Sequence, residues 1–573
     1  MIDVQTSLVD ILSWRAKHQP HRLSYRFLID GEDQEISITY KGLDLKARAI
    51  GATLQNYTLK NDRVILLLPS GLEFIAAFMG CLYAGVIAIP LPPPHPARLK
   101  KTLAATLRII EDANPSVALL NSELLESLNS QSHLKRQLDG LTLIPIDRQD
   151  MMKQPDQWVK PEIAQDGIAF LQYTSGSTLF PKGVMISHRN LMSNLNYIEK
   201  SFEQSSVSRT VIWLPPYHDM GLIGGILQPL YSGNIVTLMP HLMFLQRPVR
   251  WLQAISNFRA TTSGGPNFAY DLCLRKIKPN QLEGLDLSTW EVAFNGAEPI
   301  HLETLERFTK YFAPYGFKPE AFLTCYGLAE ATLMVSGGPK EKIPKSQRLS
   351  KKELANQRAI ISSEIEDSIS IVSCGQISEL SSLKIVNPET LMPCSQNEIG
   401  EVWISGPSVA LGYWNNPLET ASTFNAHLFD GSNVSFLRSG DLGFIHEEEL
   451  YVTGRLKNMI IIDGKNYYPH DIERTIEDFH PDINPGGCAV FSFEDSGKEF
   501  LVVIVEIRRH LVTNENDLVN GIRKVVSENY ELPIFDIKLT LPGSIPRTTS
   551  GKIKHFLCRN NYLAGSLVKK ITL

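Results

Sequence analysis

A run of hydroxyl-bearing residues, a glycine and a lysine lies between residues 173 and 183. The run reads Tyr173-Thr174-Ser175-Gly176-Ser177-Thr178-Leu179-Phe180-Pro181-Lys182-Gly183. Backbone N–H groups and hydroxyls of such a loop can donate to phosphate oxygens, and a lysine adds a compact positive charge. No Gly-Lys pair has a glycine five residues earlier and no Gly-x-Gly-x-x-Gly occurs, which removes support from P-loop and dinucleotide sites. A Ser/Thr-rich turn is more often structural, so a phosphate site needs support from other segments.

The composition is that of an ordinary globular protein. The chain has 573 residues, of which 43% are hydrophobic and 20% charged, and its net charge is −5. The length suggests about two to four domains, and the charge balance gives no reason to expect nucleic-acid binding. After Asp536, however, the chain carries seven Lys or Arg and no Asp or Glu. This basic tail fits either a solvated surface or a face for phosphates or an acidic protein partner.

Neither a secretion signal nor a transmembrane segment is expected. The N-terminal segment, Met1 to Pro20, lacks a basic start and a continuous apolar core. The longest apolar run, Phe74 to Pro92, is interrupted by two glycines and ends in a proline cluster, so we expect a buried helix followed by a strand. Seven cysteines without a Cys-x-x-Cys pair indicate buried thiols in a reducing compartment, with no metal cage or disulfide framework. We therefore expect a cytoplasmic protein.

The elements that must position the site alternate between short apolar runs and helix-length amphipathic segments. This alternation predicts βαβ units, and hence an α/β fold with parallel-rich sheets covered by helices. In such sheets ligands bind outside the carboxyl ends of the strands, so we expect the loops after the strands to form the site. The predicted strands are 63–68, 86–89, 117–120, 168–172, 211–214 and 235–239.

A smaller unit is expected from about Gly454 onward. Helices over 469–479 and 517–529 and strands over 487–493 and 500–507 are typical of a small α+β domain.

Thr174 to Gly183 resembles the phosphate loop of the adenylate-forming superfamily, which contains acyl-CoA synthetases, luciferases and peptide-synthetase adenylation domains. Further segments resemble the other motifs of this superfamily in the same order, and together they span nearly the whole chain. They are Asn295-Gly296-Ala297-Glu298-Pro299 for the adenine-side loop, Tyr326-Gly327-Leu328-Ala329-Glu330 for the aromatic-Gly-x-x-Glu motif, Ser439-Gly440-Asp441 for the ribose-binding aspartate, Gly454-Arg455-Leu456-Lys457 for the hinge, and Pro546 to Lys552 for the terminal loop with the catalytic lysine.

The resemblance gives these residues chemical roles. Tyr326 would stack on adenine, Asp441 would accept bonds from ribose hydroxyls, and Glu330 would hold the Mg²⁺ that bridges the ATP phosphates. Lys552 would stabilise the negative charge that builds on the α-phosphate during attack by the carboxylate. Taken alone, Tyr326 could be a core aromatic, Glu330 a surface charge, and the Ser-Gly-Asp step a turn. The residues that the resemblance assigns to the nucleotide are Thr174, Ser175, Gly176, Ser177, Thr178, Lys182, Gly183, Asn295, Gly296, Ala297, Glu298, Tyr326, Gly327, Asp441 and Arg455.

The resemblance also implies how the chain is divided. An N-terminal adenylation domain, 1–454, would contain the parallel-rich sheets and a β-barrel-like subdomain. A hinge, 455–457, with Lys457 as the hinge residue, would join it to a mobile C-terminal domain, 458–573, that carries Lys552. Rotation of this domain would alternate an adenylating and a transferring arrangement.

The segment Trp213 to Leu222 resembles the corresponding segment of fatty acyl-AMP ligases. His218 within it would have both a catalytic and a substrate-binding role, although a lone His-Asp step is usually structural. The run Gly264 to Tyr270 would line an apolar pocket with few charges. An amino-acid-activating relative usually carries an acidic residue near this place, and Asp271 is the only candidate. The residues expected to bind the acyl substrate are His218, Asp219, Met220, Gly264, Pro266, Asn267 and Phe268.

The polar stretch Lys340 to Glu366 bears on the acceptor. By itself it could be a tolerated surface insertion, since loops accept extra length easily. Fatty acyl-AMP ligases differ from acyl-CoA synthetases by an insertion at this place, before a segment like Val372 to Gly375. In that family the insertion is thought to pack between domains and hinder the rearrangement that CoA transfer needs. Leu179, where acyl-CoA synthetases commonly have glycine, supports the same branch.

These observations predict a two-step enzyme. A long-chain fatty acid and ATP with Mg²⁺ would give acyl-AMP and pyrophosphate, and the acyl group would pass to the phosphopantetheine of a separate acyl carrier protein for lipid, polyketide or lipopeptide synthesis. Two alternatives stay open: a fatty acyl-CoA synthetase and, from another class, a non-catalytic nucleotide-binding protein. Thioester formation with added CoA would indicate the first, and the absence of acid-dependent pyrophosphate exchange the second.

Overall fold

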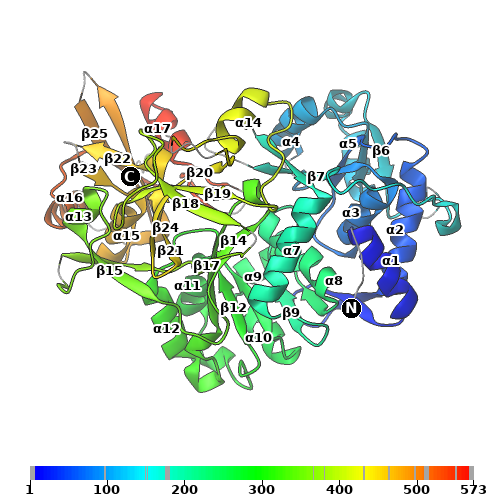
Figure 1. Cartoon of the computed structure of the whole chain (residues 1–573), viewed down its shortest axis with the longest axis horizontal. Helices are drawn as coiled ribbons and strands as arrows, with labels where there is room; N and C mark the ends of the chain where they lie inside the picture. The colour runs from blue at the N-terminus through cyan, green and yellow to red at the C-terminus, as the bar shows by residue number, and fades with distance from the viewer. Residues whose placement is uncertain are drawn as a thin grey trace.

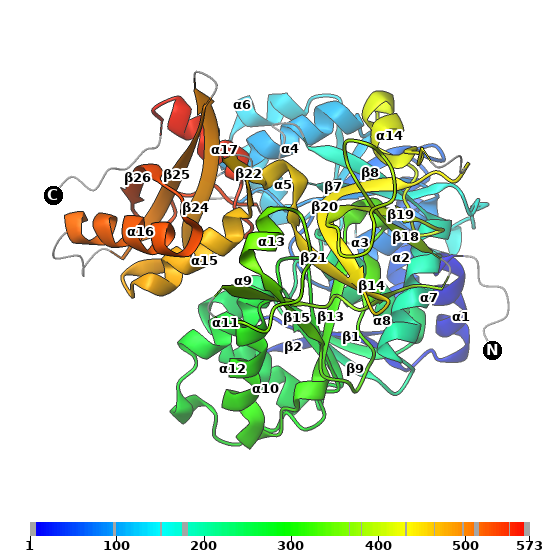
Figure 2. The same cartoon turned by 60° about the vertical axis from the view of Figure 1, so that its left-hand side comes forward.

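The computed structural model describes most of the chain. It covers residues 7–95, 99–148, 150, 152–174, 181–365, 367–379, 381–429, 433–462, 465–495, 498–508, 515–548 and 551–566. Of the expected phosphate loop, Ser175, Gly176, Ser177, Thr178 and Leu179 lie outside the described residues. In Figures 1 and 2 the C-terminal elements, orange and red, form a smaller body beside the larger blue-to-yellow one.

The first sheet is parallel except at one end. Its strands are β3 Arg63–Leu67, β4 Ile87–Pro90, β5 Val117–Leu120, β6 Thr142–Pro145, β7 Ile168–Thr174 and β8 Lys182–Ser187, and the helices of this region are α2 Tyr40–Leu54, α3 Leu72–Ala84, α4 Leu99–Ala113, α5 Ser122–Asn129 and α6 Ser132–Lys135. The described strands lie in the order β6-β5-β3-β4-β7-β8, with β7 and β8 antiparallel. The strands predicted at 63–68, 86–89, 117–120 and 168–172 are confirmed.

The second sheet is longer and contains the other predicted strands. Its strands are β1 Leu23–Leu28, β2 Glu35–Thr39, β9 Arg209–Ile212, β10 Ile235–Leu238, β11 Thr262–Gly265, β12 Val292–Asn295, β13 Phe322–Gly327, β14 Met334–Gly337 and β17 Gln376–Ile377. The described strands lie in the order β17-β14-β13-β12-β11-β9-β10-β1-β2. The helices of this part are α1 Leu8–His18, α7 His188–Phe202, the π-helix η5 Met220–Leu227, α8 Gln228–Ser232, α9 His241–Gln246, α10 Val249–Asn257, α11 Asn267–Lys276 and α12 Leu302–Phe312.

An antiparallel sheet follows where the β-barrel-like subdomain is expected. It consists of β18 Ser382–Val386, β19 Gly400–Ser405, β20 Leu437–His446 and β21 Glu449–Arg455, with α14 Pro417–Phe424 beside it. The stretch 340–366 and its continuation form a separate antiparallel pair, β15 Ser346–Ser350 and β16 Ser368–Val372, with the short helix α13 Lys351–Ala355 between the strands.

The C-terminal elements have hydrophobic cores of their own. They are β22 Ile460–Ile462, β23 Lys465–Tyr467, α15 Pro469–Phe479, β24 Ile483–Asp495, β25 Lys498–Ile507, α16 Glu515–Tyr530, β26 Ile534–Thr540 and α17 His555–Leu563. Strand β25 pairs with β24 antiparallel and with β26 parallel. The predicted helix 469–479 agrees with α15 at both ends, and the other predicted elements of this unit are confirmed with longer bounds.

Helix α3 and strand β4 account for the long apolar run between residues 74 and 92. All residues of α3 except Glu73 are buried. Gly85 ends the helix with φ 72°, a left-handed conformation that a Cβ disfavours. The predicted buried helix and strand are therefore confirmed. Within the described ranges, no helix is long and apolar enough to cross a bilayer.

The strand arrangement explains where the predicted site residues meet. Strands β9, β11, β12 and β13 run parallel to one another, so that their carboxyl ends lie at one edge of the sheet. The segments that follow β9, β11 and β12 and the end of β13 carry many of the residues that the sequence indicated.

Candidate active site

Asp441 and Arg455 lie opposite each other on β20 and β21. The Arg455 Nε donates to Oδ1 of Asp441 at 2.8 Å, and the hydroxyl of Tyr326 donates to Oδ2 at 2.8 Å. Attraction to Asp441 raises the pKa of Arg455, and burial raises that of Tyr326, so the first stays charged and the second stays a neutral donor. Each carboxylate oxygen accepts more than one hydrogen bond, so Asp441 can still accept ribose hydroxyls.

Glu330 and Lys182 are linked through two residues that the sequence did not single out, Tyr413 and Glu419. The hydroxyl of Tyr413 donates to Oε1 of Glu330 at 2.8 Å. The ammonium of Lys182 lies 4.9 Å from the centre of the Tyr413 ring and forms an ion pair with Glu419. The hydrogen bond from Lys182 lowers the pKa of Glu419. The phosphate-loop lysine and the expected metal carboxylate therefore lie around one tyrosine ring.

The turn after β12 brings Glu298 against the loop after β11. Its Oε1 accepts a hydrogen bond from the backbone N–H of Phe268 at 2.6 Å. Ala297 has φ 70°, which is uncommon for a residue with a Cβ. A Cβ on Gly296 would lie 2.7 Å from the carbonyl oxygen of Cys325, so the turn approaches β13 closely. Burial raises the pKa of Glu298 to about 7.

His218 and Asp219 form a close pair at the start of η5. Nδ1 of His218 lies 2.5 Å from Oδ1 of Asp219, and the same oxygen accepts from the backbone N–H of Met220 at 2.7 Å. Burial opposes ionisation, but His218 and the backbone bond outweigh it and lower the pKa of Asp219. The pair therefore supplies a carboxylate that is ionised at neutral pH.

Lys552 comes to these residues from the C-terminal unit. Burial and the positive charge of Arg455 lower the pKa of Lys552, while Asp219, Glu298 and Asp441 oppose this shift. Asp219 at the start of η5, Glu298 in the turn after β12 and Asp441 on β20 thus interact electrostatically with one ammonium. Part of the Lys552 side chain is exposed to solvent. The surrounding protein therefore replaces some of the water around this side chain, but not all of it. The structure thus brings the predicted catalytic lysine close to three of the predicted nucleotide residues, Glu298, Asp441 and Arg455.

Aromatic side chains surround the glycines at the end of β11. A Cβ on Gly265 would lie 2.7 Å from Cζ2 of Trp213, and a Cβ on Gly264 would lie 2.2 Å from the carbonyl oxygen of Phe294. The Trp213 ring stacks on Phe244 at 4.0 Å between centroids and meets the edge of Phe268 at 6.0 Å. The expected apolar character of this part of the site agrees with these contacts.

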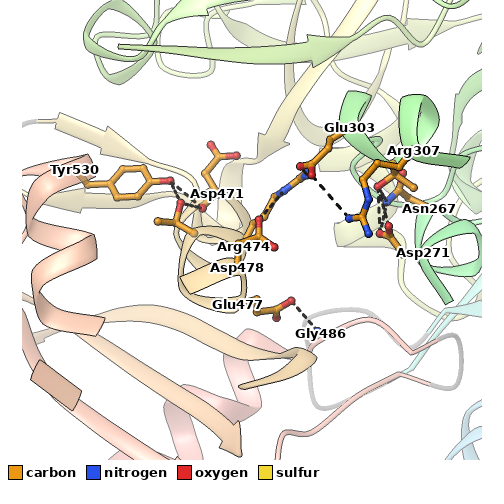
Figure 3. A network of polar contacts seen from close by, with 12 residues as sticks. Asn267, Asp271, Glu303, Arg307, Asp471, Arg474, Glu477, Asp478, Gly486 and Tyr530 are labelled. Carbon is orange, nitrogen blue, oxygen red and sulfur yellow. Dashed lines mark hydrogen bonds and ion pairs between the residues drawn. The ribbon is translucent and has the colours of Figure 1, made fainter. Parts of the chain in front are cut away.

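Asn267 and Asp271 are directed toward α12. The Asn267 amide donates to Oδ2 of Asp271 and to Oγ1 of Thr304, both at 3.2 Å, and its oxygen accepts from the backbone of His301. Asp271 also accepts from Thr304, and Figure 3 shows Asn267 and Asp271 beside Arg307. Asn295 is buried as well, and its amide donates to Asn267 at 3.4 Å. The Asn267 amide is bonded within the protein, whereas the buried side-chain oxygen of Asn295 has no hydrogen-bond partner among the described residues. The part of both amides in ligand binding stays a prediction.

Several contacts outside the nucleotide residues also join the units. Arg474 of α15 pairs with Glu303 of α12 at 2.5 Å (Figure 3). The side chain of Asn466 on β23 donates to the carbonyl oxygen of Ala355, at the end of α13. Leu354 of α13 belongs to the same hydrophobic cluster as Tyr468, which precedes α15. The inserted stretch therefore packs against the C-terminal unit.

Lys457 lies in the short 3₁₀ turn Leu456–Asn458, between the last strand of the larger unit and the first of the smaller one. Its charge contributes to the lowered pKa of Glu419. The residue expected as the hinge thus interacts electrostatically with Glu419, the partner of Lys182.

Comparison with known proteins agrees with this geometry. A family model described as AMP-binding enzyme matches residues 12–414, and a model described as Disco-interacting protein 2-like, AMP domain, matches 457–571. The chain belongs to the AMP-binding enzyme family. It is 43% identical over 568 residues to the medium-chain-fatty-acid–[acyl-carrier-protein] ligase JamA of Moorena producens, covering 98% of this chain and 96% of that one.

Solved structures place the chain among the fatty acyl-AMP ligases of this family, as the resemblance predicted. A fatty acyl-adenylate ligase from L. pneumophila, in complex with acyl adenylate and pyrophosphate, has a TM-score of 0.77 at 42% identity and covers 98% of this chain and 96% of its own. A structure from a study of fatty acyl-adenylate ligases from E. coli and L. pneumophila has a TM-score of 0.88 at 31% identity, covering 98% and 99%. The predicted α/β fold with a smaller C-terminal unit is confirmed.

Proposed function

We propose that the protein activates a fatty acid with ATP as acyl-AMP, releasing pyrophosphate, and passes the acyl group to the phosphopantetheine thiol of an acyl carrier protein. The observation that carries the proposal is the position of Lys552, near Asp219, Glu298 and Asp441 of the larger unit. Only an arrangement of this kind lets one ammonium act on a nucleotide held by the other unit.

The adenylation step follows from these residues. A carboxylate oxygen of the acid attacks the α-phosphorus, the bond to the β-phosphate oxygen breaks, and pyrophosphate leaves. Lys552 stabilises the charge that develops on the α-phosphate. Asp441, held by Tyr326 and Arg455, fixes the ribose. Lys182 exchanges Glu419 for phosphate oxygens when ATP is bound.

Magnesium is part of the proposal. Glu330 offers a hard carboxylate oxygen, and Mg²⁺ is usually held by one or two carboxylates together with substrate phosphates. Among the described residues no group of three or more His, Cys, Asp or Glu could hold a metal alone, which fits an ion that arrives with ATP. Bound there, Mg²⁺ would neutralise phosphate charge. Tyr413 orients Glu330 for this task.

A fatty acid fits better than an amino acid. Asp271, the acidic residue that the sequence offered as a partner for a substrate ammonium, is bonded to Thr304 and Asn267 on the side of α12. Burial raises the pKa of Asp271, so it is poorly suited to hold a cation. The aromatic group around Trp213 favours an apolar chain. We propose a medium- to long-chain acid, because the sequence resemblance implies a long chain and JamA is named for a medium chain.

The inserted stretch supports a carrier protein as acceptor. It contacts the C-terminal unit through Ala355 and Leu354 and thus opposes rotation about Lys457. We also propose that 458–573 is the mobile domain. A cytoplasmic location fits the ATP requirement and the seven free cysteines.

Pyrophosphate exchange over a series of fatty acids and amino acids tests the first step. We expect exchange with medium- to long-chain fatty acids and background rates with amino acids, since a buried apolar site rejects an ammonium. Equal rates with amino acids would contradict the substrate. CoA and a phosphopantetheinylated carrier protein are then offered as acceptors; thioester on CoA alone would indicate an acyl-CoA synthetase, and no exchange with any acid a non-catalytic protein.

A further inference from the structure

The loop that carries Lys552 is held mainly by its own backbone. The N–H of Thr548 donates to the carbonyl oxygen of Lys552 at 2.8 Å, and the N–H of Lys552 donates to Oγ1 of Thr548 at 3.0 Å. Lys554 closes the turn by donating to the carbonyl oxygen of Pro546 at 2.9 Å. These bonds join the described parts of the loop, residues 546–548 and 551–554, to each other, but they do not fix the place of the loop on the C-terminal unit.

A partly buried ion pair anchors the loop at its C-terminal end. Nε2 of His555, the first residue of α17, lies 2.6 Å from Oε1 of Glu473 on α15. The side chains of His555 and Glu473 are 16% and 10% exposed. The same oxygen of Glu473 accepts from the backbone N–H of Val490 on β24 at 2.9 Å. Glu473 is therefore tied to the sheet, and His555 ties the loop to Glu473.

Other acids near this pair have different partners. Glu477 accepts from the N–H groups of Gly486 and Cys488, and Glu506 accepts from the N–H of Ile545, at the other end of the loop. Of these three glutamates, only Glu473 forms an ion pair with His555, which follows Lys552 by three residues.

We propose that His555 is a positioning residue: its ion pair with Glu473 holds Lys552 in the place where it acts on the α-phosphate. This inference rests on the proposed function and assigns a further residue to the same reaction. It applies to adenylation, because Lys552 acts in that step. Transfer of a preformed acyl group to the carrier does not need Lys552 and is independent of the pair.

The pair also gives adenylation a pH dependence. Burial lowers the pKa of His555, but attraction to Glu473 and their hydrogen bond outweigh it, so the pKa lies above its usual range. His555 therefore loses its positive charge at alkaline pH, its attraction to Glu473 weakens, and the loop loosens. The titratable or charged groups packed around it are Glu473 and Glu477 on α15, Cys488 on β24, Glu506 on β25, Arg547 at the start of the loop, and Cys558 on α17.

The test separates the two steps. In His555→Ala we expect kcat for pyrophosphate exchange to fall by about tenfold or more, as a displaced catalytic group requires. Transfer from synthetic acyl-AMP to the holo carrier protein should stay within about twofold of the wild type. His555→Arg should restore exchange and remove its alkaline decline, because arginine does not titrate there. Arg559→Ala, which removes an exposed charge from the same helix, should change neither step.

Each result that departs from these expectations leads to a different conclusion. Exchange and transfer that fall together in His555→Ala, or no recovery in His555→Arg, would show a merely structural role. Unchanged exchange in His555→Ala with an active wild type would refute the positioning role and leave the proposed function intact. A wild type without exchange would refute the proposed function itself.

Discussion

The hydroxyl of Tyr326 donates a hydrogen bond to Oδ2 of Asp441 at 2.8 Å, although the two residues are 115 positions apart in the sequence. Arg455 donates to the other oxygen of the same carboxylate. The predicted adenine-stacking residue and the predicted ribose-binding residue are therefore joined by a hydrogen bond. The tyrosine ring contributes stacking area, and its hydroxyl orients the carboxylate.

Tyr326→Phe should raise the KM for ATP about fivefold with little change in kcat, because a typical hydrogen bond contributes about 1 kcal/mol and the ring remains. Asp441→Asn keeps the size of the side chain but removes its charge, and it should weaken ATP binding more than Tyr326→Phe does. Isothermal titration with a non-hydrolysable ATP analogue and steady-state exchange kinetics measure both. A fall in kcat without change in KM for Tyr326→Phe would argue against this role.

Lys552→Ala should abolish most adenylation while leaving ATP binding almost intact. Loss of one group that stabilises developing charge costs about 10²–10³-fold in rate, whereas Asp441 and Tyr326 still hold the nucleotide. The measurement is single-turnover formation of acyl-AMP alongside ATP affinity. Lys554→Ala is the matched control two positions away, and its adenylation should stay within about threefold. A Lys552 variant with a normal rate would show that the ammonium near Asp219 and Glu298 is not catalytic.

The sequence indicates the residues with a fixed chemical task, and it misses those that matter only through tertiary contact. Asp441, Glu330 and Lys552 stand in motifs that can be read along the chain. Tyr413 and Glu419 do not, because a tyrosine and a glutamate at these positions acquire meaning only when the fold brings them to Glu330 and Lys182, 83 and 237 residues away.

The helices and strands also divide into those that the sequence predicts and those that form only through tertiary contact. Helix α15 was predicted correctly because its apolar residues follow a 3.6-residue period and Pro469 marks its start. Strands β15 and β16 were not predicted: they are rich in serine, and they form because each pairs with the other.

The pH dependence of stability should include a contribution from Glu298. Burial raises its pKa from 4.5 to about 7, so the folded state binds this proton more tightly than the unfolded state does. Stability from this group is therefore present below pH 4.5 and is lost as the pH rises through about 7. Glu298→Gln, which keeps an acceptor for the Phe268 N–H, should raise the melting temperature at pH 8 more than at pH 5. An equal rise in melting temperature at pH 5 and at pH 8 would contradict the raised pKa of Glu298.

Weakening the contact between the insertion and the C-terminal unit should admit CoA as an acceptor. Leu354→Ala removes buried apolar area, a change that costs about 2–5 kcal/mol in a packed core, and Asn466→Ala removes the bond to Ala355. The double variant should form acyl-CoA above the wild-type background while pyrophosphate exchange persists. Ile361→Ala, in the same insertion but 54% exposed, is the control. If the amount of acyl-CoA does not increase, these two contacts are not what prevents CoA from acting as an acceptor.

The ion pair between Arg474 and Glu303 (Figure 3) should favour the adenylating arrangement, since it spans the two units. Both partners are partly exposed, so the contribution is small, about 0.2–1 kcal/mol. Arg474→Glu should therefore lower adenylation about two- to fivefold, because it replaces attraction by repulsion, and the effect should shrink in high salt. Adding Glu303→Arg should recover part of the loss. Arg307→Ala is the control, because Arg307 lies 3.8 Å from Glu303 within α12 and crosses no boundary. The same deficit in this control would mean that Glu303 acts through its own helix.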